Sequence, residues 1–335
     1  MKNFLIISSA LLLIGALIFI IPLAINGWDF SKVIKTNVET VTHDVDEAYT
    51  GIRIDSDTAD IILEATDGNE TAVITLDSKL MYHEVKVVDG TLTIEIKDER
   101  KWYQTLFDFS STSITVKLPI GEYEALVITE DTGDITIPEG IGFTSADLKL
   151  STGDVLYKAN TSGDVCIETS TGDITVENAT VGSLKLEAST GDVKITNVTS
   201  EGAATVNLST GNITVESSSL GSFATTATTG DLTVSGGEVK GDISITRSTG
   251  DTALTNLRAA TLTLISDTGD VKFDNFDTTG NITVTTDTGY VKGTLGSEKI
   301  FIPRSDTGKI VVPETITGGI CKITTDTGDI VISIG

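Results

Sequence analysis

An internal repeat constrains this chain more than any other feature of its sequence. One series of the dipeptide Thr-Gly runs from residue 132 to residue 328 of the 335 residues, each copy 19 or 20 residues after the last. Its eleven glycines are Gly133, Gly153, Gly172, Gly191, Gly211, Gly230, Gly250, Gly269, Gly289, Gly308 and Gly328. A unit of this size cannot bury a core alone, so the units must stack on one another. The period therefore predicts a solenoid.

Each repeat carries the apolar pattern of two short strands. Aliphatic residues stand two and four places after the glycine, as at Ile174 and Val176, and seven and five places before it, as at Leu184 and Leu186. Polar residues separate them, and this alternation is typical of half-buried strands. A third inward position falls about seven residues after the glycine and follows an asparagine in four repeats. Asparagine suits a turn with left-handed backbone angles, which we expect at Asn178, Asn197, Asn256 and Asn275.

The predicted fold is an all-β, parallel β-solenoid with about 19.5 residues per rung, an N-terminal β cap and one N-terminal transmembrane helix. Right-handed winding is expected because parallel crossovers have that hand. We divide the chain into a signal-anchor helix (1–28), a stalk (29–48), a cap (49–128) and eleven Thr-Gly repeats (129–335). The cap begins with a diverged first rung, GIRIDSDTADIIL, in which Ala59 stands in the glycine place.

The N-terminal segment indicates a membrane location. Residues 4–25 contain no charged side chain, and about 20 apolar residues are enough for a helix to cross a bilayer. The run is longer than the apolar part of most cleaved signal peptides. We therefore expect a single-pass protein of the cell membrane with the solenoid outside the cell, and a cleaved signal peptide is the alternative.

Charge and composition exclude several functional classes. The chain has 23 Lys and Arg against 48 Asp and Glu, a formal net charge of −25, which repels the phosphates of nucleic acid. Two cysteines and two histidines are too few for a disulfide scaffold or for most zinc sites. The repeat register places Cys321 inward and Cys166 outward, eight rungs apart, so both are expected to be free thiols.

The corner after each Thr-Gly is the most regular polar feature. Asp follows eight of the eleven glycines, and the structural interpretation is that Thr and Asp side chains accept backbone N–H groups there. The functional alternative is calcium. Late repeats also carry Asp two places before the glycine, and stacked carboxylates would be relieved by a hard cation. The calcium candidates are Asp267, Asp270, Asp287, Asp306, Asp326 and Asp329.

Little in the sequence favours an enzyme. The triplet Asp-Thr-Gly resembles the segment around aspartic-protease carboxylates, but here it is a recurring variant of Ser-Thr-Gly inside a repeat. Arginines in the repeats are confined to Arg247, Arg258 and Arg304, in different rungs, and His43 and His83 precede the repeats. We predict no catalytic residues and no cofactor other than calcium. A carbohydrate-active enzyme stays the weakest alternative.

Two further segments leave their roles open. The insert KWYQTLFDF carries the densest aromatic cluster, which either covers the open end of the solenoid or forms a contact patch. Its aromatic residues are Trp102, Tyr103, Phe107 and Phe109. At the other end the chain stops at Gly335, directly after the inward Ile330 and Ile332. That end is expected to be uncapped, either protected by its twist or covered by self-association with another chain.

These motifs carry a resemblance. The STGDITV and STGDVKI units, the preceding SDTADIIL and the segment LPIGEYEALVITEDTGDITI resemble the bacterial putative-adhesin family of β-strand-repeat proteins over about residues 45–335. That family is related to the heads of autotransporter adhesins. The single span also resembles membrane-anchored accessory proteins of envelope-stress systems. The resemblance implies a β-solenoid at the cell envelope with no known catalytic residues.

The first functional hypothesis is accordingly a non-enzymatic, membrane-anchored surface protein of the cell envelope, which either binds envelope polysaccharide or protein in an adhesin-like role or is structural. Its partners are the membrane, through residues 4–25, and that envelope ligand, with no nucleic acid. The alternative is an accessory protein of an envelope-stress signalling system, in which the span contacts a signalling partner.

Overall fold

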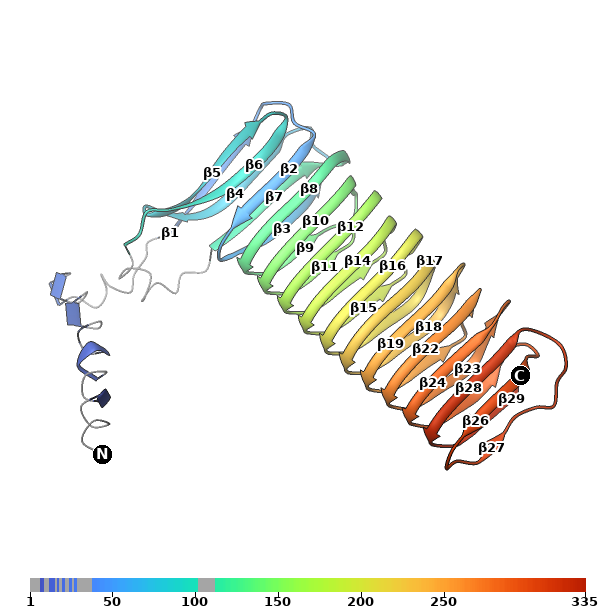
Figure 1. Ribbon diagram of the computed structural model, residues 1–335. Coiled ribbons are helices and arrows are strands. Elements are labelled where there is room, and N and C mark those ends of the chain that lie inside the picture. The colour runs from blue at the N-terminus through green and yellow to red at the C-terminus, as the bar shows by residue number, and fades with distance from the viewer. Residues whose placement is uncertain are drawn as a thin grey trace.

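Two long ladders of strands face each other along almost the whole molecule (Figure 1). The computed structural model describes residues 38–101 and 112–335, together with 7–8, 12–15, 17, 20–21, 24–25 and 27–28. Helical turns occur among the positions described before residue 28. Within this described part of the chain, no helix is long and apolar enough to cross a membrane.

The first ladder contains the strands that lead into the Thr-Gly corners. In spatial order they are β5 (Met81–Val88), β6 (Thr91–Asp98), β2 (Gly51–Ser56), β8 (Gly121–Thr132), β10 (Ile141–Thr152), β12 (Asn160–Thr171), β14 (Thr180–Thr190), β16 (Thr199–Thr210), β17 (Ile213–Thr229), β19 (Asp242–Thr249), β22 (Thr261–Thr268), β24 (Ile282–Thr288), β28 (Ile320–Thr327) and β26 (Ile300–Ser305).

The second ladder contains the strands that leave those corners. In spatial order they are β1 (Val38–Val45), β4 (Thr71–Ser78), β7 (Thr112–Pro119), β3 (Ala59–Thr66), β9 (Ile135–Ile137), β11 (Val155–Tyr157), β13 (Ile174–Glu177), β15 (Val193–Thr196), the first half of β17, β18 (Leu232–Val239), β20 (Thr252–Thr255) with β21 (Arg258–Ala259), β23 (Val271–Thr278), β25 (Val291–Leu295), β29 (Ile330–Ile334) and β27 (Ile310–Val311).

The predicted parallel β-solenoid is confirmed. Equivalent residues of successive repeats are register partners, so Ile174, Val193, Ile213 and Leu232 form one continuous inward column. Each column removes its aliphatic side chains from water, which is the main stabilising contribution to a rung that has no core of its own. The third inward position is buried as expected, as Val198 shows.

The corners have the backbone that the sequence predicted. Gly191 has φ +138°, and a Cβ added to it would lie 2.0 Å from the carbonyl oxygen of Gly172 in the rung before. Only glycine fits such a corner, because its neighbour leaves no space for a side chain and L-residues rarely adopt this φ. The opposite turns use asparagine at φ between +47° and +55°, at Asn178, Asn197, Asn256 and Asn275.

The N-terminal end is closed by antiparallel strands. β2 and β3 form the expected diverged rung, with Ala59 stacked against Gly133, and β6 and β7 add a further parallel rung outside it. β5 then pairs antiparallel with β6, and β4 and β1 extend the other ladder in the same manner. β1 lies inside the segment 29–48, so the second half of that predicted stalk is part of the β structure.

The C-terminal end corrects the expectation that the last strands of the chain form an open end. β28 lies between β24 and β26, and β29 lies between β25 and β27. The chain therefore builds its outermost rung first, at 300–311, and then returns to insert residues 320–334 beneath it (Figure 1). Ile330 and Ile332 are buried under this cover.

The new outer edge is itself protected. The N–H groups of Ile300 and Asp306 donate toward the inner neighbour, so the nitrogen of Pro303, at odd spacing from both, faces the free edge and removes a donor there. β27 has only two residues. Both features oppose edge-to-edge pairing.

Candidate functional site

The Thr-Gly-Asp corners form a continuous ladder of side chain to backbone hydrogen bonds. Oδ1 of Asp154 accepts the N–H of Asp173 at 2.7 Å, and Oδ1 of Asp173 accepts the N–H of Asp192 at 2.7 Å. The same bond links every rung from Asp60 in the cap to Tyr290, with Asn212 as the uncharged member. For Asp, the predicted structural role is confirmed: each carboxylate satisfies a corner N–H that the strand ladders leave unpaired.

The calcium candidates occupy two parallel columns. Asp270 and Asp329 belong to the hydrogen-bonded ladder, where they accept the N–H groups of Tyr290 and Lys309 at 2.9 and 2.7 Å. The other four stand two residues before their glycines on neighbouring rungs, and they are exposed: Asp267, Asp287, Asp326 and Asp306.

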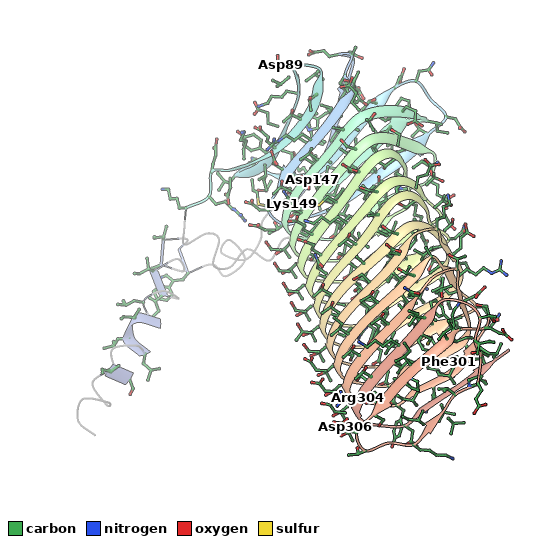
Figure 2. All side chains as sticks on the ribbon, turned by 45° about the vertical axis from the view of Figure 1, so that its right-hand side comes forward. Asp89, Asp147, Lys149, Phe301, Arg304 and Asp306 are labelled. Carbon is green, nitrogen blue, oxygen red and sulfur yellow. The ribbon has the colours of Figure 1, made fainter. Side chains whose placement is uncertain are left out.

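These four carboxylates lie one strand spacing apart, which is roughly 4.8 Å. Asp306 also forms an ion pair with Arg304 at 3.2 Å, and Figure 2 shows both side chains at the C-terminal end of the solenoid. Among the described residues, no group of three or more His, Cys, Asp or Glu side chains is arranged to hold a metal ion. Calcium binding stays a prediction.

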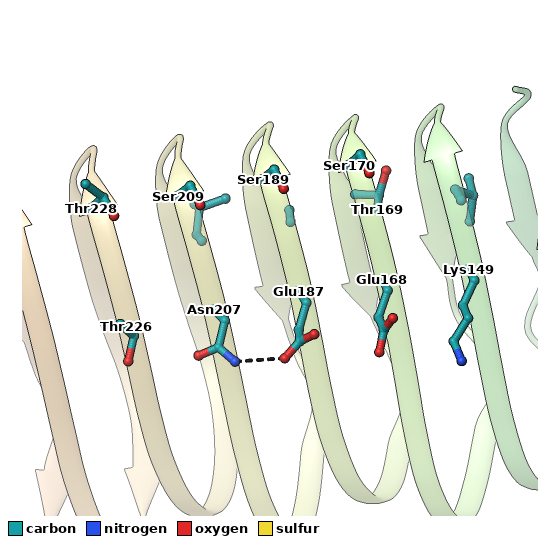
Figure 3. A pocket seen from close by; sticks show the side chains of 13 residues that line it. Lys149, Glu168, Thr169, Ser170, Glu187, Ser189, Asn207, Ser209, Thr226 and Thr228 are labelled. Carbon is teal, nitrogen blue, oxygen red and sulfur yellow. Dashed lines mark hydrogen bonds between the residues drawn. The ribbon is translucent and has the colours of Figure 1, made fainter. Parts of the chain in front are cut away.

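A shallow groove of about 530 Å³ crosses five rungs on the outer face of the first ladder (Figure 3). Two rows of side chains line it. The lower row in Figure 3 consists of Lys149, Glu168, Glu187, Asn207 and Thr226, and the upper row contains Ser170, Ser189, Ser209 and Thr228. The rows arise because alternate residues of each strand face outward and register partners stack between rungs.

The groove presents hydrogen-bonding groups at a fixed interval. Nδ2 of Asn207 donates to Oε1 of Glu187 at 2.9 Å, and Lys185 lies 3.1 Å from the same carboxylate. These two contacts, the amide first, lower the pKa of Glu187, so it is ionised at neutral pH. No aromatic side chain lines the groove. Its surface is therefore a row of hydroxyl, amide and carboxylate groups suited to a polar, extended ligand.

A second concave site, in the cap, was not identified from the sequence. A pocket of about 320 Å³ is lined by Glu39, Val41, His43, Asp77, Ser78, Lys79, Tyr82 and His83. The sequence-based division of the chain placed His43 in the predicted stalk and His83 in the predicted cap. They meet because β1 and β5 both pack near β4, and the available signal was the polar Asp77 at an inward position of a strand.

The cysteines and the catalytic candidates are placed as follows. Cys166 is half-buried and Cys321 fully buried, and both are free thiols as predicted. Burial raises the pKa of Cys321 to about 12, so that thiol is unreactive. Four of the five Asp-Thr-Gly triplets lie at successive corners at the C-terminal end, and the fifth, at 131–133, lies at the first corner. The predicted aromatic cluster at Trp102–Phe109 lies outside the described residues.

The charged side chain of Arg247 is buried inside the solenoid. Arg247 points inward, three residues before Gly250, in the column that holds Leu150 and Leu208 in earlier rungs. Its side chain is almost fully buried, and within the described part of the chain Nε, Nη1 and Nη2 have no hydrogen-bond partner. Burial lowers the pKa of its guanidinium, and the carboxylates of Asp231 and Asp251 oppose that shift.

Glu130 is the buried acid where the cap joins the first repeat. Its Oε1 accepts the N–H of Ala59 at 3.0 Å, which ties the diverged corner to β8. Burial raises the pKa of Glu130 to about 7. A carboxyl with a raised folded-state pKa stabilises the fold fully below about pH 4.5, and this contribution is lost as the pH rises through 7.

The chain is similar to several solved structures and to one protein family. No protein of curated function matches the chain. Among solved structures, a putative adhesin from Parabacteroides distasonis is 13% identical and aligns over 87% of this chain and 99% of its own, with a TM-score of 0.38. A putative adhesin from Bacteroides fragilis is 17% identical over 89% of this chain and 99% of its own, with a TM-score of 0.31.

The family comparison covers most of the solenoid. The sequence profile of the family described as Toastrack DUF4097 matches residues 49–254 and 202–302, which together include the cap and most of the repeats. The chain belongs to the Toastrack DUF4097 family.

Proposed function

We propose that this chain is a non-enzymatic binding protein of the cell envelope, anchored in the membrane by residues 4–25 and presenting its solenoid outside the cell. The observation that carries the proposal is the groove of Figure 3. Two polar rows cross five rungs, and their spacing repeats at each strand.

The ligand that suits this groove is a linear envelope polysaccharide of low charge. Successive sugar units offer hydroxyl groups along one direction, and the rows supply acceptors and donors in the same direction. The net charge of −25 disfavours strongly anionic polymers, because like charges lower both the affinity and the association rate. Rigidity contributes as well, since a preformed solenoid has little ordering entropy to lose on binding.

The test is sedimentation of the full chain with isolated cell-wall polysaccharide. Glu187→Ala combined with Asn207→Ala removes the hydrogen-bonded centre of the groove, and we expect binding to fall at least tenfold. The matched control is Lys194→Ala, on the exposed outer face of the other ladder. Equal binding by both variants, or no binding by the wild type, would count against the groove.

The membrane anchor is tested separately by fractionation. The full chain should stay with the membrane after alkaline washing, and a chain lacking residues 1–28 should be released. An N-terminus found by mass spectrometry to begin after residue 28 would favour the cleaved signal peptide instead. If replacing the span alone abolishes an envelope-stress response while polysaccharide binding persists, the accessory role is the better description.

A further inference from the structure

The two histidines of this chain lie on the same pocket. The chain contains only two, and they come from β1 and β5, which belong to opposite ladders of the cap. Both line the cavity of about 320 Å³ at the N-terminal end of the solenoid. The −25 net charge makes the chain rich in carboxylates everywhere, but imidazole groups occur at this one place.

His83 is held in a fixed orientation. Its Nδ1–H donates to Oδ1 of Asp77 at 2.6 Å, and the other oxygen of Asp77 accepts the hydroxyl of Thr75 at 2.8 Å. The side chains of His83 and Asp77 are 1% and 8% exposed. In the neutral imidazole, a proton held on Nδ1 by Asp77 leaves the lone pair on Nε2.

That second nitrogen is left without a partner by the residues that the structure describes. Nε2 of His83 is buried and makes no hydrogen bond to any of them, although His83 lines the pocket. An unpaired polar atom in such a place is costly, and a bound ion or a water molecule would complete it. A carboxylate that holds one imidazole nitrogen while the other is free is the arrangement that metal-binding histidines show.

His43 supplies the second imidazole. It is half-buried on β1, and its Nε2 lies 3.5 Å from the hydroxyl of Thr75, the same residue that donates to Asp77. Glu39 lies four residues before His43 on the same face of β1. It adds an exposed carboxylate to the pocket lining. Among the described residues, no group of three or more His, Cys, Asp or Glu side chains is arranged to hold an ion, so coordination by both histidines requires the half-buried His43 to leave the Thr75 hydroxyl.

We propose that this pocket binds one divalent late transition-metal ion, of the zinc, nickel and copper class, through Nε2 of His83 and the imidazole of His43. Asp77 is the positioning residue. Imidazole ligands select this class over calcium and magnesium, which prefer oxygen donors. Glu39 and water complete the coordination. The site is independent of the polysaccharide groove, which lies on the outer face of the repeats.

The experiment is calorimetric titration of the full chain, purified in mild detergent without a histidine tag, with zinc chloride and, separately, calcium chloride. We expect one zinc ion per chain, and no comparable binding of calcium to the pocket. His43→Gln is the primary variant because His43 is half-buried and its substitution leaves the buried pair intact. His83→Gln removes the fixed ligand, and circular dichroism and the melting temperature report whether each variant is folded.

Loss of the stoichiometric zinc site in both variants supports the proposal, and Asp77→Asn should weaken zinc binding by about 10–100-fold. X-ray absorption at the zinc edge should show two imidazole ligands, a signal that a purely structural pair would not produce. Absence of stoichiometric zinc binding overturns the proposal. So does wild-type affinity in folded His43→Gln, because the ion would then sit on surface carboxylates.

Discussion

Replacing Arg247 by leucine should stabilise the solenoid. The guanidinium is buried at 2% residue exposure with all three nitrogens unpartnered. Its register neighbours are Ala227 and Ser266, and the corresponding places in earlier rungs hold Leu150 and Leu208. A leucine at this position therefore continues the aliphatic side of the column, where Leu208 and Ala227 precede it, and leaves no buried charge.

The magnitude follows from the groups removed. An unsatisfied buried donor costs about 1–3 kcal/mol, more when it is charged. The carboxylates of Asp231 and Asp251 recover part of this cost. Exchanging buried ionic groups for apolar residues of similar volume is often stabilising by about 1–4 kcal/mol. We expect Arg247→Leu to raise the free energy of unfolding by about 2 kcal/mol and the melting temperature by a few degrees.

The assay is thermal and guanidinium-induced unfolding followed by circular dichroism. Arg258→Leu is the matched control, because Arg258 is exposed on β21 and its loss should change stability by less than about 0.5 kcal/mol. A decrease of more than about 1 kcal/mol in Arg247→Leu would refute the reasoning. It would mean that the guanidinium has partners, such as internal water, that offset its burial.

Further predictions concern the cap junction, the corners and the outer edge. Glu130→Gln keeps an acceptor for the N–H of Ala59 but cannot ionise, so it should exceed the wild type in stability by about 2–3 kcal/mol at pH 8 and by little at pH 4. Gly191→Ala forces a Cβ against a carbonyl oxygen at positive φ and should cost at least about 3 kcal/mol in a denaturation experiment. Asp192→Ala removes the acceptor of a ladder N–H and should cost about 1 kcal/mol. Pro303→Val restores a free-edge N–H and should produce concentration-dependent association in sedimentation velocity.

Each of these four predictions has a control variant or a result that would contradict it. Gly68→Ala places a Cβ no closer than 4.0 Å to any other atom and should be neutral. Asp192→Asn should retain stability, because the ladder already contains an asparagine at Asn212. A stability difference between Glu130→Gln and the wild type that does not vary with pH would contradict the burial argument. A Pro303→Val variant that sediments like the wild type at all concentrations would show that the edge is protected by something other than Pro303.

The sequence predicted that polar residues face outward on the solenoid, but it did not predict where these residues form a groove or a pocket. The sequence identified the outward polar positions, and register turns them into the rows that include Glu187 and Asn207. It could not identify the cap pocket, because His43 and His83 are 40 residues apart in strands without a repeat. Their meeting depends on how the antiparallel strands β1, β4 and β5 close the end of the solenoid.

The sequence by itself determined the rung. Four features of the rung are local properties that recur along the repeats. They are the 19.5-residue period, the inward aliphatic columns, the glycine corners and the asparagine turns. Such information is sufficient because every rung contacts only its neighbours.

The tertiary structure alone decided the order of the last rungs, the inward burial of Arg247 and the meeting of the two histidines. Every rung contacts only its neighbours, so the repeat pattern does not specify the order in which equivalent rungs stack. At the C-terminal end the outermost rung is the one that carries Pro303, whose nitrogen offers no donor at the free edge.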